Sequence, residues 1–210
     1  MSAGGRRERK KRLTRDALSA AAIELFLERG FDAVSVAEIA AAAGVSKPTL
    51  FSYFASKEDL VLHRIADHEG EQARVVAGRP AGMAPLAALE AFALAGIEAR
   101  DPVTGLNDHP AVLAFHGMVF ATPSLAGRLA HYTGRDEELL ADALAAAVPG
   151  VPAPRPALAA GQIVTVRRVL ARENWRRLSA GESADAVLPD ALAAARDAFA
   201  GLRRGLADYA

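Results

Sequence analysis

A short polar segment near the N-terminus has the residue types that hydrogen-bond to nucleic acid. If the segment is helical, its outward side chains are Lys47, Thr49, Ser52 and Tyr53. Amines and hydroxyls of this kind reach base edges or phosphates when their helix lies in a major groove. Such contacts require a scaffold that projects the helix, so the chemistry depends on the elements around it.

Two capped helices and a tight turn are predicted around this segment. Ser35 and Glu38 match a capping box, in which each side chain accepts from the backbone N–H of the other residue. Gly44 ends this first helix, and Ser46 offers a second N-cap two residues later. Pro48 then falls in a first helical turn, where its missing N–H removes no intrahelical bond. Two short helices joined in this way are typical of a helix-turn-helix motif.

Further helices are predicted on either side of the motif, which spans residues 35–54. Apolar residues at helical spacing predict a helix over residues 14–29, and Gly30 ends it. Another capping pattern, at Ser56, opens a fourth helix that extends toward Arg74. The first part of the chain should therefore fold as a small helical domain.

The net charge of zero hides a basic N-terminal arm. Residues 1–15 contain seven basic residues and one acidic residue, a net charge of +6, so the rest of the chain carries −6. A basic run is often only a solvated tail. Placed before a helix-turn-helix domain, it can also reach phosphates or a flanking minor groove. Without DNA we expect this arm to be disordered.

The stretch from residue 12 to residue 60 resembles the DNA-binding domain of the TetR family of bacterial transcriptional regulators. The resemblance is strongest over AEIAAAAGVSKPTLFSYF, residues 37–54, followed by KEDL at residues 57–60, and it covers roughly the first third of the chain. It implies that the helix beginning at Ser46 is the recognition helix. It also implies phosphate contacts from three residues, which are Ser35, Tyr53 and Lys57.

The sequence departs from the common family pattern at Pro48, where glycine is frequent, and at Phe51, where tyrosine is frequent. Phe51 lacks a hydroxyl, so it suits a thymine methyl group or the DNA backbone better than a polar base edge. The predicted DNA-binding residues are Ser35, Ser46, Lys47, Pro48, Thr49, Ser52, Tyr53 and Lys57.

Composition predicts an all-α chain. The chain has 210 residues, 51% hydrophobic and 6% aromatic, with recurrent alanine runs that favour helices over sheets. Cysteine is absent, which excludes disulfides, thiolate metal sites and thiol nucleophiles and fits a reducing compartment. No motif of a nucleotide-binding enzyme, a serine hydrolase or a metalloprotease occurs. We expect a cytoplasmic protein that is not an enzyme, spans no membrane and needs no cofactor.

The five histidines do not predict a metal site. His63 and His68 are five residues apart, off a common helical face, and His109 and His116 are seven residues apart across the start of a helix. A lone histidine in a helical domain usually makes an ordinary hydrogen bond or titrates in solvent. We therefore expect no metal ligands.

Residues 73–210 indicate a second helical domain, with helices separated by proline and glycine and a proline-rich spacer at residues 149–156. The family resemblance implies that this domain binds a small molecule. The predicted ligand-binding residues, which would supply apolar walls and one polar group, are Phe92, Phe115, His116, Met118 and Phe120. The alternative is that these residues form an ordinary core.

An apolar seam runs along the last predicted helix. From Leu188 to Leu206 its apolar residues are spaced by 4, 3, 4, 3 and 4 residues, and the preceding helix has a similar pattern. One alternative is packing within the chain. The resemblance favours the other, in which the last two helices pair with those of a second subunit as a four-helix bundle. The predicted interface residues are Ile163, Val166, Leu170, Leu192, Phe199, Leu202 and Leu206.

Together these patterns predict an all-α homodimer with two domains. Residues 12–72 would form a three-helix helix-turn-helix domain after the basic arm, and residues 73–210 a ligand-binding and dimerisation domain. The expected function is a DNA-binding transcriptional regulator, a repressor released by a small molecule from a palindromic operator in double-stranded DNA. An activator, or a regulator without a ligand, stays open. The alternative class is an all-helical small-molecule-binding protein or enzyme whose N-terminal helices are only a structural cap.

Overall fold

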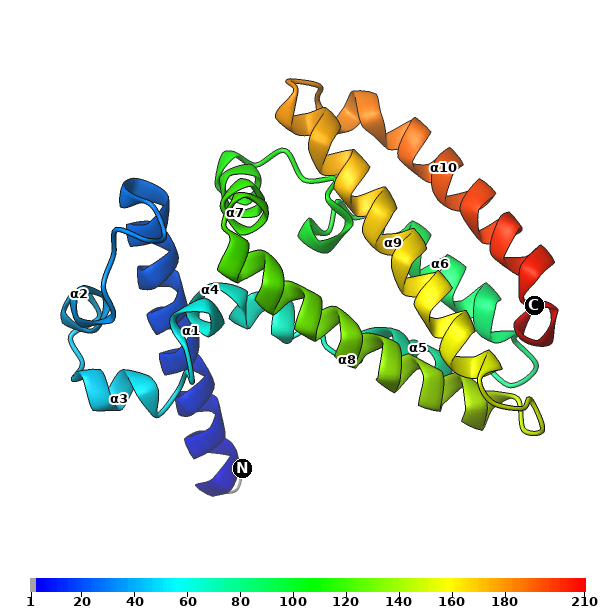
Figure 1. Ribbon diagram of the computed structural model, residues 1–210, viewed down its shortest axis with the longest axis horizontal. Helices are drawn as coiled ribbons and strands as arrows, with labels where there is room; N and C mark the ends of the chain where they lie inside the picture. Colours follow the sequence, from blue (N-terminus) through cyan, green and yellow to red (C-terminus); the bar gives the residue numbers. More distant parts are fainter. Residues whose placement is uncertain (1–2) are drawn as a thin grey trace. The chain divides into compact units, whose positions relative to one another are not determined.

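The structure is a computed structural model that describes residues 3–210, with the backbone alone for Ala3, Gly4 and residues 6–8. Every regular element in this range is a helix, which confirms the all-α prediction (Figure 1). No single described helix is long and apolar enough to span a membrane. One pair, α7 (Pro110–Ala121) with α8 (Pro123–Ala147), meets the length and composition test together, but the two helices are bent by 94° where they join.

The chain divides into two compact units. The first contains the residues up to Asp67 together with Ala114–Leu129, and the second contains His68–Leu113 and Ala130–Ala210. The units therefore differ from the predicted domains, because the first break falls before residue 72 and a later segment joins the N-terminal helices. Sequence periodicity identifies helices, but it does not show which distant segment packs with them.

The first unit is built on one long helix that carries the helix-turn-helix. Its N-terminal helices are α1 (Ala3–Arg29), α2 (Val36–Ala42), α3 (Lys47–Phe51) and α4 (Lys57–Ala66). Both α2 and α4 pack on α1, and α3 packs on α2. The buried side chains that join them are Leu18, Ala22, Phe26, Phe31, Val34, Ile39, Leu50, Phe54 and Leu60. The predicted helix-turn-helix is therefore present, with Gly44 in the left-handed region at φ +65° in its turn.

The basic arm is part of α1, so the expectation of a disordered arm is wrong for the described residues. The helix starts at Ala3 instead of residue 14. Arginine, lysine and glutamate are good helix formers, and the arm extends a helix whose C-terminal half is fixed by packing. The side chains of Arg6 and Arg7 lie outside the described residues.

The fourth helix ends earlier than predicted. α4 stops at Ala66, and α5 (Glu71–Ala77) begins after Gly70, which has a φ of +72°. The backbone N–H of Gly70 donates to Asp136 Oδ1 at 2.7 Å. Because a left-handed glycine interrupts the helical hydrogen-bond series, the apolar periodicity continues across a break that it does not reveal.

The second unit consists of helices packed around α6 and α9. Its elements, besides α5 and parts of α7 and α8, are α6 (Pro85–Glu98), the 3₁₀ turn η1 (Pro102–Thr104), α9 (Arg155–Ser179), α10 (Ala184–Gly205) and η2 (Ala207–Tyr209). α10 packs on both α6 and α9 (Figure 1). The proline-rich spacer predicted at residues 149–156 has no regular structure up to Pro154, but α9 already includes Arg155 and Pro156. A proline is tolerated there because it lies in the first turn of the helix.

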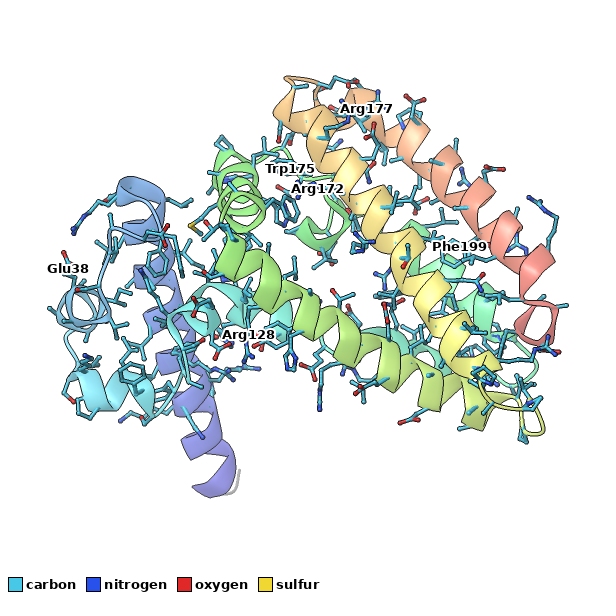
Figure 2. All side chains as sticks on the ribbon, viewed as in Figure 1. Glu38, Arg128, Arg172, Trp175, Arg177 and Phe199 are labelled. Carbon is cyan, nitrogen blue, oxygen red and sulfur yellow. The ribbon has the colours of Figure 1, made fainter. Side chains whose placement is uncertain are left out.

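The apolar seam of α9 and α10 faces the core of its own chain. Ile163, Phe199, Leu202 and Leu206 are all buried in one cluster (Figure 2 labels Phe199). These four residues are therefore not available for a subunit interface, which corrects that part of the prediction. A heptad-like spacing shows that a face is apolar, but any partner helix can cover it, and here α6 does. Val166, Leu170 and Leu192 are only partly buried.

Two further contacts fix α9. Gly105 follows the 3₁₀ turn η1 and has a φ of +71°. It lies so close to the backbone of Ala171 that a Cβ at this position would be 1.9 Å from the Ala171 carbonyl oxygen. Asn174 Nδ2 donates to the Thr104 carbonyl in the same contact at 2.9 Å.

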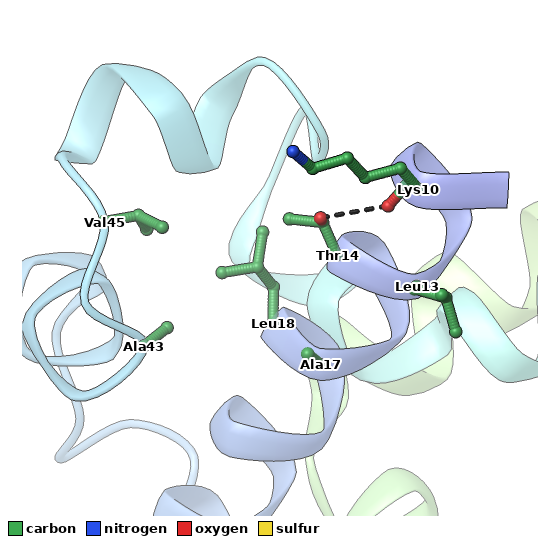
Figure 3. A pocket seen from close by; sticks show the side chains of 7 residues that line it. All are labelled: Lys10, Leu13, Thr14, Ala17, Leu18, Ala43 and Val45. Carbon is green, nitrogen blue, oxygen red and sulfur yellow. Dashed lines mark hydrogen bonds between the residues drawn. The ribbon is translucent and has the colours of Figure 1, made fainter. Parts of the chain in front are cut away.

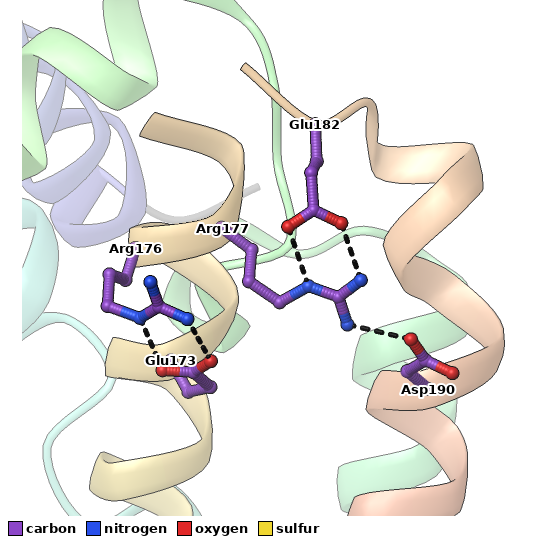
Figure 4. A network of polar contacts seen from close by, with 5 residues as sticks. All are labelled: Glu173, Arg176, Arg177, Glu182 and Asp190. Carbon is purple, nitrogen blue, oxygen red and sulfur yellow. Dashed lines mark hydrogen bonds and ion pairs between the residues drawn. The ribbon is translucent and has the colours of Figure 1, made fainter. Parts of the chain in front are cut away.

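At the turn between α9 and α10 a partly buried arginine joins the two helices. Arg177 Nε donates to Glu182 at 2.9 Å and Arg177 Nη1 donates to Asp190 at 2.8 Å (Figure 4). Glu173 and Arg176 form a separate pair one turn earlier. The bidentate contact to Glu182 makes the geometry of this turn specific.

Candidate nucleic-acid interface

α3 holds the predicted recognition residues in a fixed position. The Ser46 Oγ caps the helix by accepting from the Thr49 N–H at 3.2 Å, and it lies 2.7 Å from Thr49 Oγ1. Leu50 is fully buried and anchors the helix to α2. Of the side chains predicted to face outward, Lys47, Thr49 and Ser52 are exposed and Tyr53 is partly buried. Ser46 and Pro48 are exposed as well.

The hydroxyl contacts within α3 determine what it can offer a groove. Ser52 Oγ donates to the Thr49 carbonyl at 2.6 Å, so the Ser52 hydroxyl keeps only its capacity to accept. One of the two hydroxyls of Ser46 and Thr49 donates its hydrogen to the other, so only one of these two hydroxyl hydrogens can be donated to an acceptor outside the protein. Together with the ammonium of Lys47, α3 therefore presents donors suited to guanine O6 and N7 or to phosphate oxygens.

Phe51 adds an apolar group to this polar surface. Its side chain is 44% exposed, which is unusual for a phenylalanine. An exposed ring on the same helix as Lys47 and Thr49 can contact a thymine methyl group, as expected from its missing hydroxyl.

Lys57 is occupied inside the unit, although the resemblance implies a phosphate contact for it. Its Nζ donates to the Phe31 carbonyl, and it lies 4.4 Å from the centroid of the Phe31 ring. A second ring, that of Phe26, has its centroid 5.4 Å away. The side chain therefore fastens the start of α4 to the end of α1. Tyr53 is partly buried next to these elements and keeps a part of its surface exposed.

Ser35 is likewise engaged, in the predicted capping box. Its N–H and its hydroxyl both donate to Glu38, at 2.8 and 2.7 Å, and the Glu38 N–H donates back to Ser35 Oγ at 3.3 Å. Arg29 donates to the same carboxylate at 2.8 Å. These hydrogen bonds, those from Ser35 first, lower the pKa of Glu38 to about 2. In this structure Ser35 therefore starts α2 and has no donor left for a phosphate.

The arm of α1 carries exposed positive charge and borders a groove. Arg9, Lys10, Lys11 and Arg12 are exposed. A groove of about 320 Å³ lies between α1 and the turn before α3 (Figure 3). Its lining residues are Lys10, Leu13, Thr14, Ala17, Leu18, Ala43 and Val45.

The five predicted ligand-binding residues do not all belong to one unit. Phe115, His116, Met118 and Phe120 are partly buried in the segment that joins the first unit. His116 stacks on Phe120 with ring centroids 5.8 Å apart, and burial lowers its pKa.

Phe92 belongs to the second unit. The Arg167 guanidinium lies over its ring, 5.1 Å from the centroid. The ligand-binding role of all five residues stays a prediction.

Sequence reasoning missed the contacts that connect distant parts of the first unit. Arg128 Nε donates to Asp59 Oδ1 at 2.9 Å, which ties the segment 114–129 to α4. Asp16 of α1 contacts His63 of α4 across 47 positions of the sequence. No local sequence pattern predicts either pair, because the two residues of each pair lie far apart in the chain. Arg128 in addition belongs to no recognised motif.

The chain is similar to known regulatory proteins. The model of the family described as bacterial regulatory proteins, tetR family, matches residues 18–63. The HTH-type transcriptional regulator TcmR of Streptomyces glaucescens is 38% identical over 136 residues, which make up 64% of this chain and 59% of that protein. The HTH-type transcriptional activator FasR of Mycolicibacterium smegmatis is 47% identical over 70 residues, 31% of this chain and 32% of that protein. The chain thus spans less than two thirds of either relative.

Solved structures share the fold over most of the chain. GusR of Salmonella enterica superposes with a TM-score of 0.55 at 22% sequence identity. The matched region makes up 90% of this chain and 93% of GusR. NalD, the secondary repressor of the MexAB-OprM multidrug efflux pump in Pseudomonas aeruginosa, has a TM-score of 0.55 at 20% identity, with 89% and 97% covered. At this identity the likeness concerns the fold alone. Together with the helix-turn-helix geometry, the match at residues 18–63 shows that the chain contains a domain of the tetR family of bacterial regulatory proteins.

Proposed function

We propose that the protein is a sequence-specific transcriptional regulator that binds double-stranded DNA through α3. The observation that carries this proposal is the fixed, outward position of Lys47, Thr49 and Ser52 on a capped helix whose Leu50 is fully buried. A recognition helix reads a major groove only when its side chains are exposed and its orientation is fixed, and α3 meets both conditions. The exposed basic residues of α1 would add phosphate contacts at the flank.

The proposed assembly is a homodimer on a palindromic operator. Two recognition helices about 34–36 Å apart can read two half-sites one turn apart. The partly buried residues Val166, Leu170 and Leu192 stay candidates for the interface, whereas the fully buried seam does not. A regulator of this kind would act in the cytoplasm, where it meets the chromosome.

The proposed control is release by a small molecule, which makes the protein a repressor. Ligand bound by the second unit would favour a conformation with a different spacing of the two recognition helices, so both could no longer enter successive grooves. By reciprocity, DNA must weaken the binding of this ligand by the same factor. FasR is named an activator and NalD a repressor, so the sign of control needs its own test in a reporter strain.

A gel-shift experiment tests the proposal. The full chain is titrated against DNA from upstream of its own gene and against random DNA of equal length at the same salt concentration. We expect the upstream DNA to bind at least about a thousandfold more tightly. Equal affinity for both DNAs would contradict sequence-specific binding, and no binding to either would favour the alternative of a helical ligand-binding protein or enzyme.

A further inference from the structure

A buried histidine lies between two carboxylates where α4 packs on α1. The Nε2 of His63 is 3.0 Å from Asp16 Oδ1, and its Nδ1 is 3.7 Å from Asp67 Oδ1. The His63 side chain is only 2% exposed. The Phe54 ring meets the imidazole edge-on, with centroids 5.6 Å apart, so packing holds the orientation of the imidazole. Asp16, His63 and Asp67 each offer one ligand atom, and these atoms lie within 4.8 Å of one another.

The contact with Asp16 determines which ring nitrogen carries the proton. A carboxylate only accepts, so the Nε2–H of His63 donates to Asp16, and the Nδ1 of the neutral ring has a free lone pair. This Nδ1 is buried and has no hydrogen-bond partner among the described residues. It faces Asp67, which also can only accept. With the ring neutral, His63 Nδ1 and Asp67 Oδ1 are therefore two electron-pair donors that face each other.

The distance between these two atoms favours a metal ion over a hydrogen bond. At 3.7 Å, Nδ1 and Asp67 Oδ1 are too far apart for a good hydrogen bond. Bond lengths of about 2.0–2.2 Å place two ligands of a tetrahedral ion roughly 3.3–3.6 Å apart. His63 and Asp67 are also one helical turn apart, so their side chains share a face of α4.

The local charge favours a cation as well. Among the described side chains, neither Asp16 nor Asp67 pairs with a lysine or an arginine. Arg15, the neighbour of Asp16, lies over the Phe54 ring instead, 5.4 Å from its centroid. Two unneutralised carboxylates beside a buried lone pair are the surroundings in which a divalent ion is stabilised.

We propose that His63 Nδ1 and Asp67 bind one divalent transition-metal ion, with Asp16 as the carboxylate that orients the histidine. Carboxylate–histidine–metal arrangements of this kind fix the tautomer and raise the basicity of the ligand nitrogen. Water would complete the coordination. The ion would fix the His63 ring at the end of α4, and the contact of that ring with Asp16 of α1 would in turn stiffen the unit that carries α3. The histidine spacing alone did not predict this site, because both partners of His63 are aspartates and one of them lies on another helix.

Metal titration of the full chain tests the proposal, and it does not depend on DNA binding. Protein without an affinity tag is treated with a chelator, dialysed and titrated with Co²⁺, which is followed by its visible absorption, and with Zn²⁺, which is followed by calorimetry and thermal unfolding. We expect one strongly bound ion per chain and a higher melting temperature with Zn²⁺.

Variants identify the ligands. Asp67→Asn changes a side chain that is 60% exposed, so the fold should persist while metal affinity falls more than tenfold. Asp16→Asn should weaken binding about 10- to 100-fold. The matched control is His68→Gln. His68 is a nearby histidine whose Nδ1 lies 3.1 Å from Glu71 Oε2 and not at the proposed site, so this variant should bind the metal like the wild type.

Three outcomes would overturn the proposal. The first is a wild-type protein whose absorption and melting temperature do not respond to either metal. The second is unchanged affinity in Asp67→Asn, and the third is loss of binding in His68→Gln alone. Because circular dichroism monitors the fold of each variant, a misfolded protein is not mistaken for a missing ligand.

Discussion

At the scale of single residues, the chemistry of α3 depends on how its hydroxyls are already used. Ser52 has donated its hydroxyl hydrogen to the Thr49 carbonyl, and Ser46 and Thr49 share another. Of these three residues only Ser46 or Thr49 can donate outward without breaking an existing bond. If α3 lies in a major groove as proposed, the amine of Lys47 and one hydroxyl therefore decide which base edges it can recognise.

Thr49 should contribute to sequence preference. Replacing Thr49 with valine removes the hydroxyl and keeps the shape, so discrimination should fall by roughly tenfold at one base pair of each half-site. Thr49→Ser keeps the hydroxyl and should preserve the preference. Binding to operators with single base-pair changes, measured at constant salt, distinguishes the two variants. An equal loss of affinity on all sequences in Thr49→Val would contradict a role in base recognition.

Lys57 should contribute to the stability of the fold and not to DNA affinity. Lys57→Met keeps the aliphatic stem but removes the ammonium that donates to the Phe31 carbonyl, so the free energy of unfolding should fall by about 1.5–3 kcal/mol. Urea unfolding measures this loss. The salt dependence of DNA binding gives the contrasting test: a phosphate contact from Lys57 would make its slope shallower by about 0.9 in the variant, and a structural role would leave it unchanged.

At the scale of elements, the approach of η1 to α9 should tolerate no side chain at Gly105. Gly105→Ala places a Cβ against the Ala171 carbonyl at a residue with φ +71°, so we expect a loss of at least about 2 kcal/mol. The matched control is Gly134→Ala in the middle of α8, where a Cβ meets nothing within 4 Å and should stabilise the helix by about 0.5–1 kcal/mol. Thermal unfolding of both variants checks the opposite signs.

The break between α4 and α5 depends on Asp136, which accepts from the buried N–H of Gly70. Burial raises the pKa of Asp136. The folded state therefore favours the neutral carboxyl, and the wild type loses stability from this group as the pH rises through its raised pKa. Asp136→Asn keeps the acceptor and should lack this pH-dependent loss.

Asp136→Ala leaves the Gly70 N–H without its acceptor and should cost about 1–3 kcal/mol. Urea unfolding at pH 4 and pH 7 compares both variants with the wild type. The free energy of unfolding of Asp136→Asn, relative to that of the wild type, should increase from pH 4 to pH 7. If it does not, ionisation of Asp136 does not destabilise the folded state.

Local signals predicted the elements of the first unit well. The caps at Ser35, Ser46 and Ser56 lie within three residues of the groups they bind, so the sequence itself contains both partners. The end of α4 was not predictable in this way, because the acceptor that holds Gly70 is on α8.

At the scale of the whole molecule, the proposed dimer needs an apolar surface that the core has not used. On α9, Leu158 is 59% exposed and Val169 is 52% exposed, and they lie 11 residues apart, which is close to three helical turns. The partly buried Val166 and Leu170 pack against the core instead. This outer face of α9, defined by Leu158 and Val169, is a better candidate for the interface than the buried seam.

Charges on this face should separate the subunits. The double variant Leu158→Asp with Val169→Asp should be monomeric, because two carboxylates cannot be buried without partners. Met83→Asp, at another exposed apolar residue outside α9, should remain dimeric. Light scattering after size-exclusion chromatography gives the masses. A dimeric double variant would place the interface elsewhere.

The amino-acid pattern could identify the seam as apolar but could not identify what covers it. The spacing from Leu188 to Leu206 fits α6 of the same chain as well as a helix of another subunit, and burial of Phe199 decides for the former. The contact between Asp16 and His63 was equally out of reach, since it depends on how α1 and α4 pack and not on either sequence alone.

The pairing of Asp59 with Arg128 limits how the protein can be dissected. A fragment cut after residue 72 would contain the recognition helix and its scaffold, but it would lose the guanidinium that neutralises a carboxylate only 10% exposed. Short N-terminal fragments should accordingly unfold more easily than the same helices in the intact chain. DNA affinities measured on such fragments would underestimate those of the full protein.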